Sequence, residues 1–405
     1  MRILVIGGGA SGMTAALTAA ARPEHRVTLL ERQARVGRKL AATGNGRCNL
    51  TNCSPGAFPY HGGDPDFARP ALAAFPQGET LSWFASLGLL TTEEPSGRVY
   101  PFSDQAGSVV DVLRLALEQR GVQVETGCEV TALSFRDGAF FAETAQRRFA
   151  ADRVIVACGG AAGGKLGGGD AGYRLLAGFG HRCTALHPAL VQLRTDPTWV
   201  RSLKGVRAEA GVRLLCGGDL RAESRGEVQF TEYGLSGPAV FEISRAASTG
   251  SGPMAVVLDL LPPMDEASLS HFLEDRTRRN PALTMENLLT GLLQNRLGRT
   301  VVRACGYAFE QPLKRLDRRG CRAVAHAVKD FRLPLLGTLG MDQAQVTAGG
   351  VRTDEFDPVT LESRLQPGLY ACGEVLDIDG DCGGWNLQWA WSSGRAAGLG
   401  EEGRP

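Results

Sequence analysis

The first 31 residues place two apolar runs on either side of a glycine cluster. The run at residues 2–6 predicts a short buried strand, and the alanine-rich residues 15–21 predict a helix that ends near Pro23. The second apolar run, at residues 27–31, predicts the next strand. The chain therefore opens on a β-α-β unit.

The apolar spacing changes twice along the rest of the chain. Up to about residue 186 we expect a helix, then strands, a hairpin-like stretch to residue 149 and one more strand; the ranges are 109–120, 122–125, 130–135 and 153–157. Short alternating segments over residues 187–261 predict antiparallel β-structure, and helical spacing follows over 265–331. A strand at 369–372 and a helix at 384–398 then restore the α/β pattern.

These changes predict an interrupted α/β fold. We expect a nucleotide-binding domain of Rossmann type over residues 1–186 plus 346–405. An antiparallel, β-barrel-like subdomain over 187–263 plus 334–345 interrupts it, and a small helical subdomain occupies 264–333. The length of 405 residues fits two or three domains.

Composition excludes several classes of protein. Hydrophobic residues at 43% and charged residues at 21% are typical of a globular protein, and the net charge of +1 does not favour a polyanion binder. The ten cysteines show no paired CxxC spacing, and no run of about 20 apolar residues occurs. We therefore expect a cytoplasmic protein with no membrane contact and no metal site, whose oligomeric state the sequence leaves open.

The glycine cluster has the spacing of a dinucleotide-binding fingerprint. Gly7-x-Gly9-x-x-Gly12 follows a strand and opens a helix, and Glu31 ends the second strand 19 residues after Gly12. The helix N-terminus offers N–H groups and partial positive charge to a pyrophosphate, while Glu31 can accept hydrogen bonds from ribose hydroxyls. The fingerprint alone does not separate FAD from NAD. Further strand-to-helix junctions at Gly159-Gly160 and after Gly373-Glu374 favour the longer FAD.

Two longer segments carry a resemblance to a known family. They are Arg38 to Asn52, RKLAATGNGRCNLTN, and Gly373 to Gly394, GEVLDIDGDCGGWNLQWAWSSG. With Phe230 to Pro238 and Val346 to Val351, they make the chain similar to the BaiN/YhiN-type family of bacterial NAD(P)- and FAD-dependent oxidoreductases. The resemblance covers nearly the whole chain and implies a glutathione-reductase-like FAD fold. It also implies hydride transfer from reduced flavin to an unsaturated substrate, as in enones or a uridine of ribosomal RNA.

The fingerprint and the resemblance together predict the residues that contact FAD. The resemblance places Thr43 to Asn49 beside the pyrophosphate and flavin edge, and it directs the backbone N–H groups of Gly383 to Gln388 at the flavin N1 and C2 oxygen. The full set is Gly7, Gly9, Ala10, Ser11, Gly12, Glu31, Arg32, Arg38, Lys39, Thr43, Gly44, Asn45, Gly46, Arg47, Cys48, Asn49, Val130, Gly159, Gly160, Gly373, Glu374, Asp379, Gly383, Gly384, Asn386, Leu387 and Gln388.

Two departures from the family pattern mark a divergent branch. Glu232-Tyr233 follows Thr231 where the family has a histidine, and residues 161–169, which include Lys165, replace a loop containing Ser-Tyr-Pro. Glu232, Tyr233 and Lys165 are candidates for a general acid because these motif positions are expected near the substrate. A structural tyrosine and a solvated lysine are equally good interpretations. The run Gly163 to Gly169 has no assigned role.

Cys48 and Cys53 have the CxxxxC spacing of flavin-dependent disulfide reductases, so Cys48 is a fourth catalytic candidate. No second fingerprint marks an NAD(P) domain, and the C-terminus lacks a His-Glu pair, which disfavours this alternative. Asp377, Asp379 and Asp381 alternate without the spacing of an EF-hand, so no metal is expected.

The sequence therefore predicts an FAD-dependent oxidoreductase that acts on a small substrate and receives electrons transiently from NAD(P)H. One alternative stays open. Residues 271–333 carry 13 Lys and Arg against 6 Asp and Glu. Such a basic helical segment is most often a solvated face, yet it could dock structured RNA through Arg315, Arg318, Arg319 and Arg322.

Overall fold

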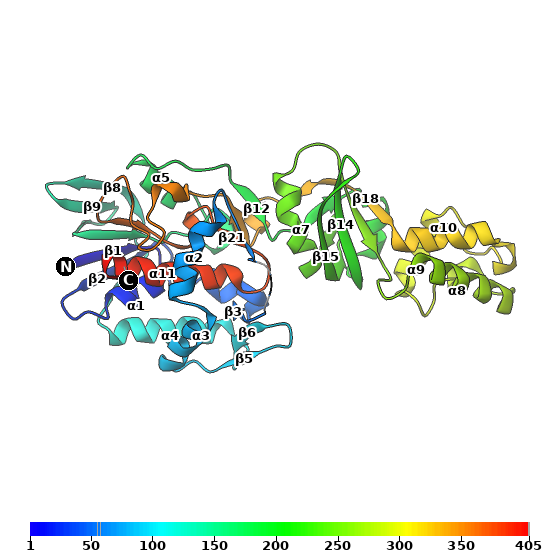
Figure 1. Cartoon of the computed structure of the whole chain (residues 1–405), viewed down its shortest axis with the longest axis horizontal. Helices are drawn as coiled ribbons and strands as arrows, with labels where there is room; N and C mark the ends of the chain where they lie inside the picture. The colour runs from blue at the N-terminus through cyan, green and yellow to red at the C-terminus, as the bar shows by residue number, and fades with distance from the viewer. Residues whose placement is uncertain (55, 57, 404–405) are drawn as a thin grey trace. The chain divides into compact units, whose positions relative to one another are not determined.

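The computed structural model describes residues 1–54, 56 and 58–403. These residues form two compact units (Figure 1). Unit 1 contains Met1–His187 and the chain from Gln345 onward, whereas unit 2 contains Pro188–Ala344. Each unit buries its own hydrophobic cluster.

A parallel five-stranded sheet forms the centre of unit 1, in the order β20-β11-β1-β2-β7. Its register places Val5 beside both Leu29 and Ile155. All four apolar residues Ile3 to Ile6 are buried, as expected for a central parallel strand. The strands are β1 (Arg2–Ile6), β2 (Arg26–Glu31), β7 (Gln123–Thr126), β11 (Arg153–Val156) and β20 (Leu369–Ala371).

Two helices, one from each end of the chain, pack against each other beside this sheet (Figure 1). They are α1 (Ala10–Ala19) and α11 (Trp385–Leu399). Their contact is close because glycines of α11 face small residues of α1, so a Cβ at Gly394 would lie 2.4 Å from the Ser11 carbonyl oxygen. This packing brings the fingerprint and the C-terminal motif into one unit.

The remaining elements of unit 1 are short. Strands β8 (Val130–Arg136), β9 (Ala139–Thr144) and β10 (Arg148–Ala151) form an antiparallel sheet. Strand β3 (Thr51–Asn52) pairs with β6 (Arg98–Pro101), which pairs with β5 (Thr91–Glu93), and β4 (Tyr60–His61) pairs with β21 (Asp379–Gly380). The helices are α2 (Arg69–Ala74), α3 (Gln77–Ser86), α4 (Ala106–Gln119) and α5 (Ala171–Ala177), and β19 (Val346–Ala348) begins the return segment.

A buried histidine ties the two chain segments of unit 1 together. The ring of His181 bonds Glu355 at 3.0 Å and Ser363 at 2.8 Å, and it stacks on Phe356. Arg182 donates to the same Glu355 carboxylate at 2.8 Å. The return of the chain after residue 345 is thus fixed by buried, satisfied polar groups.

Unit 2 contains a closed antiparallel barrel in the order β13-β16-β15-β14-β17-β18. The strands are β13 (Leu193–Thr195), β14 (Arg207–Cys216), β15 (Asp219–Phe230), β16 (Gly234–Ser236), β17 (Met254–Asp259) and β18 (Phe331–Thr338). Between β17 and β18 lie the helices α8 (Glu266–Arg279), α9 (Asn295–Ala304) and α10 (Arg318–Lys329). The unit also holds α6 (Pro197–Val200) and α7 (Pro238–Thr249), and β12 (His187–Ala189) spans its first boundary.

The predicted fold class is confirmed by the parallel sheet, the antiparallel barrel and the helices between its last two strands. Differences are local. Helix α1 begins at Ala10 rather than at residue 15, because the helix starts directly at the glycine turn. The periodicity did not predict α2, α3, β5, β6 or α7, which are short or lie in segments of mixed spacing.

Candidate functional site

The fingerprint glycines lie where β1 passes into α1. Gly7 has φ +111°, and a Cβ there would lie 2.3 Å from the Ala157 carbonyl oxygen, so only glycine fits this turn. A Cβ at Gly12 would lie 1.9 Å from the Gly7 oxygen, whereas none of the described atoms comes within 4 Å of a Cβ at Gly9. The backbone at Gly9 is therefore open beside the N-terminus of α1, as a pyrophosphate site requires.

Glu31 is fixed at the end of β2 by two backbone N–H groups. Its carboxylate accepts from Gly8 N and from Gln33 N, each at 2.7 Å. Because each of its two oxygens keeps further acceptor capacity, Glu31 can still bind ribose hydroxyls. Val130 is buried at the start of β8, two residues after Cys128. The Cys128 N–H donates to the Glu31 carbonyl oxygen.

Arg32 holds the glycine-rich loop that the sequence left without a role. Its guanidinium donates to the carbonyl oxygens of Gly167 at 2.6 Å and Gly168 at 2.9 Å. A Cβ at Gly169 would lie 3.0 Å from the same guanidinium. The loop is thus anchored one residue from Glu31, while Lys165 at its tip is exposed.

A second carboxylate, Glu374, follows β20. It forms an ion pair with Lys39 at 2.7 Å and accepts from Thr347 N at 2.8 Å. A Cβ at Gly160 would lie 2.6 Å from Glu374 Oε1, and one at Gly373 would lie 2.5 Å from Ser11 Oγ. The structure therefore brings together predicted residues from three distant parts of the chain.

The segment from Thr43 to Asn49 forms an irregular loop. Its backbone is left-handed at Gly44, Asn45, Gly46 and Cys48. The Thr43 hydroxyl donates to the Leu40 carbonyl oxygen at 2.7 Å. The N–H groups of Arg47 and Cys48 donate to the carbonyl oxygens of Gly44 and Thr43, so hydrogen bonds within the loop hold this shape.

The two predicted arginines near this loop have protein partners. Arg47 pairs with Glu94 at 3.0 Å and with Asp104, and it lies over the Tyr100 ring. Arg38 donates to the Gln33 side chain at 2.6 Å. The charge of Arg47 is therefore paired with carboxylates of the protein, whereas Arg38 is hydrogen-bonded to a neutral side chain.

The turn at Gly383-Gly384 precedes α11. Gly384 has φ +104°, and a Cβ there would lie 2.6 Å from the Thr51 carbonyl oxygen and 2.8 Å from Asn49 Oδ1. Asn49 is 9% exposed, and its Oδ1 accepts no hydrogen bond from the described residues. Since a buried acceptor without a partner is costly, this atom marks a place for a donor from a ligand.

This arrangement fits the pyrimidine edge of a flavin. The first N–H groups of α11 lack helical partners, and no acidic residue lies in its first turn, so the helix end favours an electron-rich atom. Asn49 Oδ1 could accept a hydrogen bond from a ring N–H. The pyrimidine edge of a flavin presents both a donor and acceptors, so it would match Asn49 Oδ1 and the first N–H groups of α11.

Four other predicted residues lie in this segment, and the side chains of two of them, Asn386 and Gln388, bond protein groups. Asn386 closes the turn through hydrogen bonds to Gly380 N at 2.9 Å and Gly380 O at 2.7 Å. Gln388 is fully buried, and its side chain bonds Thr51, Phe75, Thr80 and Ser392. Asp379 is buried in β21, and Leu387 is partly buried.

None of the four catalytic candidates has the environment of an activated group. Glu232 forms an exposed ion pair with Lys204 at 2.8 Å, and Tyr233 accepts from Thr195 N through its backbone oxygen. Burial raises the pKa of the Cys48 thiol to about 12, so this group is a neutral thiol at neutral pH. Cys53, the other half of the CxxxxC spacing, is exposed.

Two residues near the Gly383-Gly384 turn were not among the contacts predicted from the sequence. The Asn52 amide donates to the Gly383 carbonyl oxygen at 2.9 Å, and Arg98 lies beside it. Asn52 ends the Arg38–Asn52 motif but was not among the predicted contacts, and Arg98 lies outside every motif. Only the pairing of β3 with β6 could have identified them, and the periodicity gave no strand at β6.

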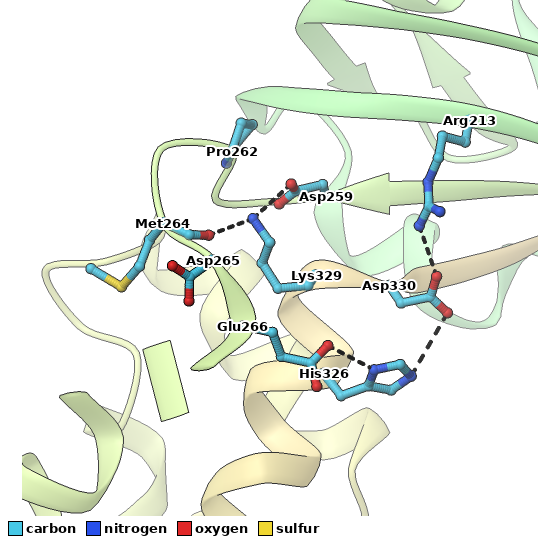
Figure 2. A pocket seen from close by; sticks show the side chains of 9 residues that line it. All are labelled: Arg213, Asp259, Pro262, Met264, Asp265, Glu266, His326, Lys329 and Asp330. Atoms are coloured by element: carbon cyan, nitrogen blue, oxygen red, sulfur yellow. Dashed lines mark hydrogen bonds and ion pairs between the residues drawn. The ribbon is translucent and has the colours of Figure 1, made fainter. Parts of the chain in front are cut away.

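Unit 2 holds a charged pocket of about 600 Å³ (Figure 2). Lys329 pairs with Asp259 at 2.7 Å and donates to the carbonyl oxygens of Leu261 and Met264. Arg213 pairs with Asp330 at 2.9 Å, and His326 contacts Glu266 at 3.1 Å. The charges of this pocket are paired with one another.

Within the described part of the chain, no helix is long and apolar enough to span a membrane. The same residues contain no group of three or more His, Cys, Asp or Glu side chains suited to a metal ion.

Comparison with known proteins supports the family suggested by the sequence motifs. A family model described as the HI0933-like protein Rossmann domain matches residues 1–400. The 3-dehydro-bile acid delta(4,6)-reductase of Clostridium scindens is 43% identical over 408 residues, covering 100% of both chains. The ribosomal RNA dihydrouridine synthase of Escherichia coli is 32% identical over 392 residues, covering 96% of this chain and 95% of the relative.

A solved structure, the 3-ketosteroid-delta4-(5alpha)-dehydrogenase of Rhodococcus jostii RHA1, is 18% identical with a TM-score of 0.49, covering 98% of this chain and 95% of the other. The family match over almost the whole chain and the identity of 43% are decisive. The chain belongs to the HI0933-like family of flavoprotein oxidoreductases, in agreement with the resemblance found in its sequence.

Proposed function

We propose that this protein is an FAD-dependent reductase that adds two hydrogens across a carbon–carbon double bond conjugated to a carbonyl group, with NAD(P)H as the electron donor. The observation that carries the proposal is the unpaired, buried Oδ1 of Asn49 beside the N-terminus of α11. The names of the two relatives, a delta(4,6)-reductase and a dihydrouridine synthase, also denote saturation of a double bond.

The residues of unit 1 would hold FAD along its whole length. Glu31 would bind the adenosine ribose, the N–H groups at the start of α1 would bind the pyrophosphate, and Glu374 would bind the ribityl chain. The start of α11 and Asn49 would hold the pyrimidine edge. When bound, FAD supplies the hydride chemistry, so the protein contributes binding, orientation and charge.

The test is reconstitution followed by rapid-reaction measurements. The purified protein is expected to take up one FAD, and NADH or NADPH should reduce that flavin under anaerobic conditions. Enones added to the reduced protein should reoxidise it. A protein that binds no FAD, or a reduced flavin that no enone reoxidises, would overturn this proposal.

A second candidate keeps the same chemistry and changes the substrate to structured RNA. Arg315, Arg318, Arg319 and Arg322 lie exposed at the start of α10 and just before it, and the Escherichia coli relative is named for ribosomal RNA. Arg318 is paired with Glu274 at 3.1 Å, which reduces its free charge. Salt-dependent RNA binding that is lost when all four arginines are changed to glutamine would support this candidate. RNA binding that is indifferent to these changes would leave α10 as a solvated basic face.

The dithiol alternative is the weakest of those considered. A disulfide reductase needs a thiolate to attack a disulfide, and burial keeps Cys48 protonated. A flavin reductase that uses Cys48 and Cys53 would require this thiol to become exposed.

A further inference from the structure

Arg98, in strand β6, lies against the Gly383-Gly384 turn. Antiparallel pairing of β3 with β6 places Asn52 opposite Arg98, so the two side chains project from the same face. That face meets Gly383, since a Cβ there would lie 3.2 Å from Asn52 Nδ2 and 3.4 Å from Arg98 Nε. Asn52 is bonded to the turn, whereas Arg98 only adjoins it.

The guanidinium of Arg98 is half-buried and has no carboxylate partner among the described residues. Of the carboxylates in this region, Glu94 and Asp104 are paired with Arg47, and Glu93 at the end of β5 is exposed. Asp381, the residue after β21, pairs with His61 at 2.7 Å. Arg98 therefore brings to the turn a positive charge that no carboxylate of the described residues neutralises, so this charge is available to a ligand.

A second, independent group at the same turn lacks a partner. Asn49 is more than nine-tenths buried, and its unpaired Oδ1 adjoins Gly384, the residue after Gly383. The two adjacent glycines are thus flanked by an unpaired donor on one residue and an unpaired acceptor on the other. Such a pairing of unmet groups indicates a ligand with both kinds of polar atom.

We propose that Arg98 binds an anionic oxygen at the Gly383-Gly384 turn. This inference rests on the proposed function, which supplies two sources of such an oxygen. One is the C2 oxygen of the flavin, which gains negative charge on reduction. The other is the carbonyl oxygen of the substrate.

The second source follows from the balance of the reaction. A hydride from reduced flavin forms a C–H bond at the β-carbon, and the electron pair of the double bond moves toward the carbonyl oxygen. A proton from solvent then forms the second C–H bond at the α-carbon. The substrate is reduced and the flavin is oxidised, while Arg98 stabilises the oxygen that carries the negative charge between the two steps.

The experiment compares the FAD-loaded wild-type protein with Arg98→Gln and Arg98→Lys. Arg136→Gln, a change at an exposed arginine in the β8–β9 hairpin, is the matched control. Flavin content and thermal unfolding establish that each variant folds. Three quantities are then measured: the flavin midpoint potential, the affinity of the oxidised protein for 4-nitrophenolate, and kcat and KM with an enone.

Each source predicts a different result. If Arg98 faces the flavin, the midpoint potential of Arg98→Gln becomes more negative and Arg98→Lys restores part of the shift. If it faces the substrate, the potential is unchanged, 4-nitrophenolate binds at least about tenfold more weakly, and kcat falls by about 10²-fold, as when one oxyanion donor is removed. Either pattern supports the proposal when Arg136→Gln behaves as wild type.

Arg98→Gln that retains the wild-type potential, phenolate affinity and kcat would overturn the proposal while leaving the proposed function intact. A wild-type protein that binds FAD but reduces no enone would overturn the proposed function. In that case a shifted potential in Arg98→Gln still supports the role of Arg98, and an unshifted potential with unchanged phenolate affinity overturns it.

Discussion

The Gly383-Gly384 turn of unit 1 and the charged pocket of unit 2 both have charged side chains. The two regions differ in whether these side chains have partners within the protein. In the pocket, Lys329 and Arg213 each meet a carboxylate within 3 Å. At the turn, Arg98 and Asn49 Oδ1 have no such partner among the residues that the structure describes. Polar groups without protein partners, rather than a cavity or a high density of charge, therefore distinguish the site that we propose for FAD.

The largest expected effect is on the backbone of the turn. Gly384→Ala adds a Cβ at φ +104°, 2.6 Å from the Thr51 carbonyl oxygen, so the turn must move. We expect about 10²-fold weaker FAD binding and a loss of about 2 kcal/mol in the free energy of unfolding. Isothermal titration with FAD and urea unfolding measure the two effects.

The control is Gly138→Ala, at a glycine that also has positive φ but none of the described atoms within 4 Å of a Cβ. It should lose stability through backbone strain alone and keep its FAD affinity. Equal losses of FAD affinity in both variants would mean that the turn has no special role.

The pocket predicts the opposite pattern. Lys329→Met removes the partner of Asp259 and the donor to two carbonyl oxygens, so we expect the free energy of unfolding to fall by about 2 kcal/mol. FAD affinity should not change. Lys314→Met, at an exposed lysine of the same unit, should change neither quantity in urea unfolding and FAD titration. A large loss of FAD affinity in Lys329→Met would break the comparison between the two regions.

Asn49 and Gln388 sharpen the comparison within unit 1. Asn49→Leu removes an unpaired buried acceptor, so the FAD-free protein should keep its stability while FAD binds about tenfold more weakly. Gln388→Leu should instead destabilise the FAD-free protein, because its side chain bonds four protein groups. Thermal unfolding with and without FAD separates the two. Loss of stability in FAD-free Asn49→Leu would show that Oδ1 has a structural partner.

At neutral pH the smallest effect is expected at Cys48, because its titration affects stability only in the alkaline range. Burial raises the pKa of this thiol from 9.0 to about 12, so the folded state holds the proton more tightly than the unfolded state. The contribution to stability is therefore complete below pH 9 and is lost as the pH rises toward 12. Cys48→Ser should lose less stability than the wild type between these values in unfolding measured against pH. Identical pH profiles would show that Cys48 does not titrate in this range.

The sequence predicted the β-α-β unit that carries the fingerprint, while the contacts of its residues with FAD stay a prediction. Gly7, Gly12 and Glu31 lie within one β-α-β unit, so short-range spacing was sufficient to place them. Sequence could not tell which predicted residues serve the protein itself. Gln388 is an example, since its partners Thr51, Phe75 and Thr80 lie more than 300 residues away.

Sequence by itself determined the α/β class, the family and the dinucleotide fingerprint, because these depend on hydrophobic periodicity and on motifs of contiguous residues. Tertiary structure alone decided which polar groups remain without partners. The Asn52 amide donates to the carbonyl oxygen of Gly383, which lies 331 residues later in the sequence. Arg98 lies beside this contact. Strand pairing and helix packing set these contacts, and whether a charge is paired depends on the side chains that folding brings beside it.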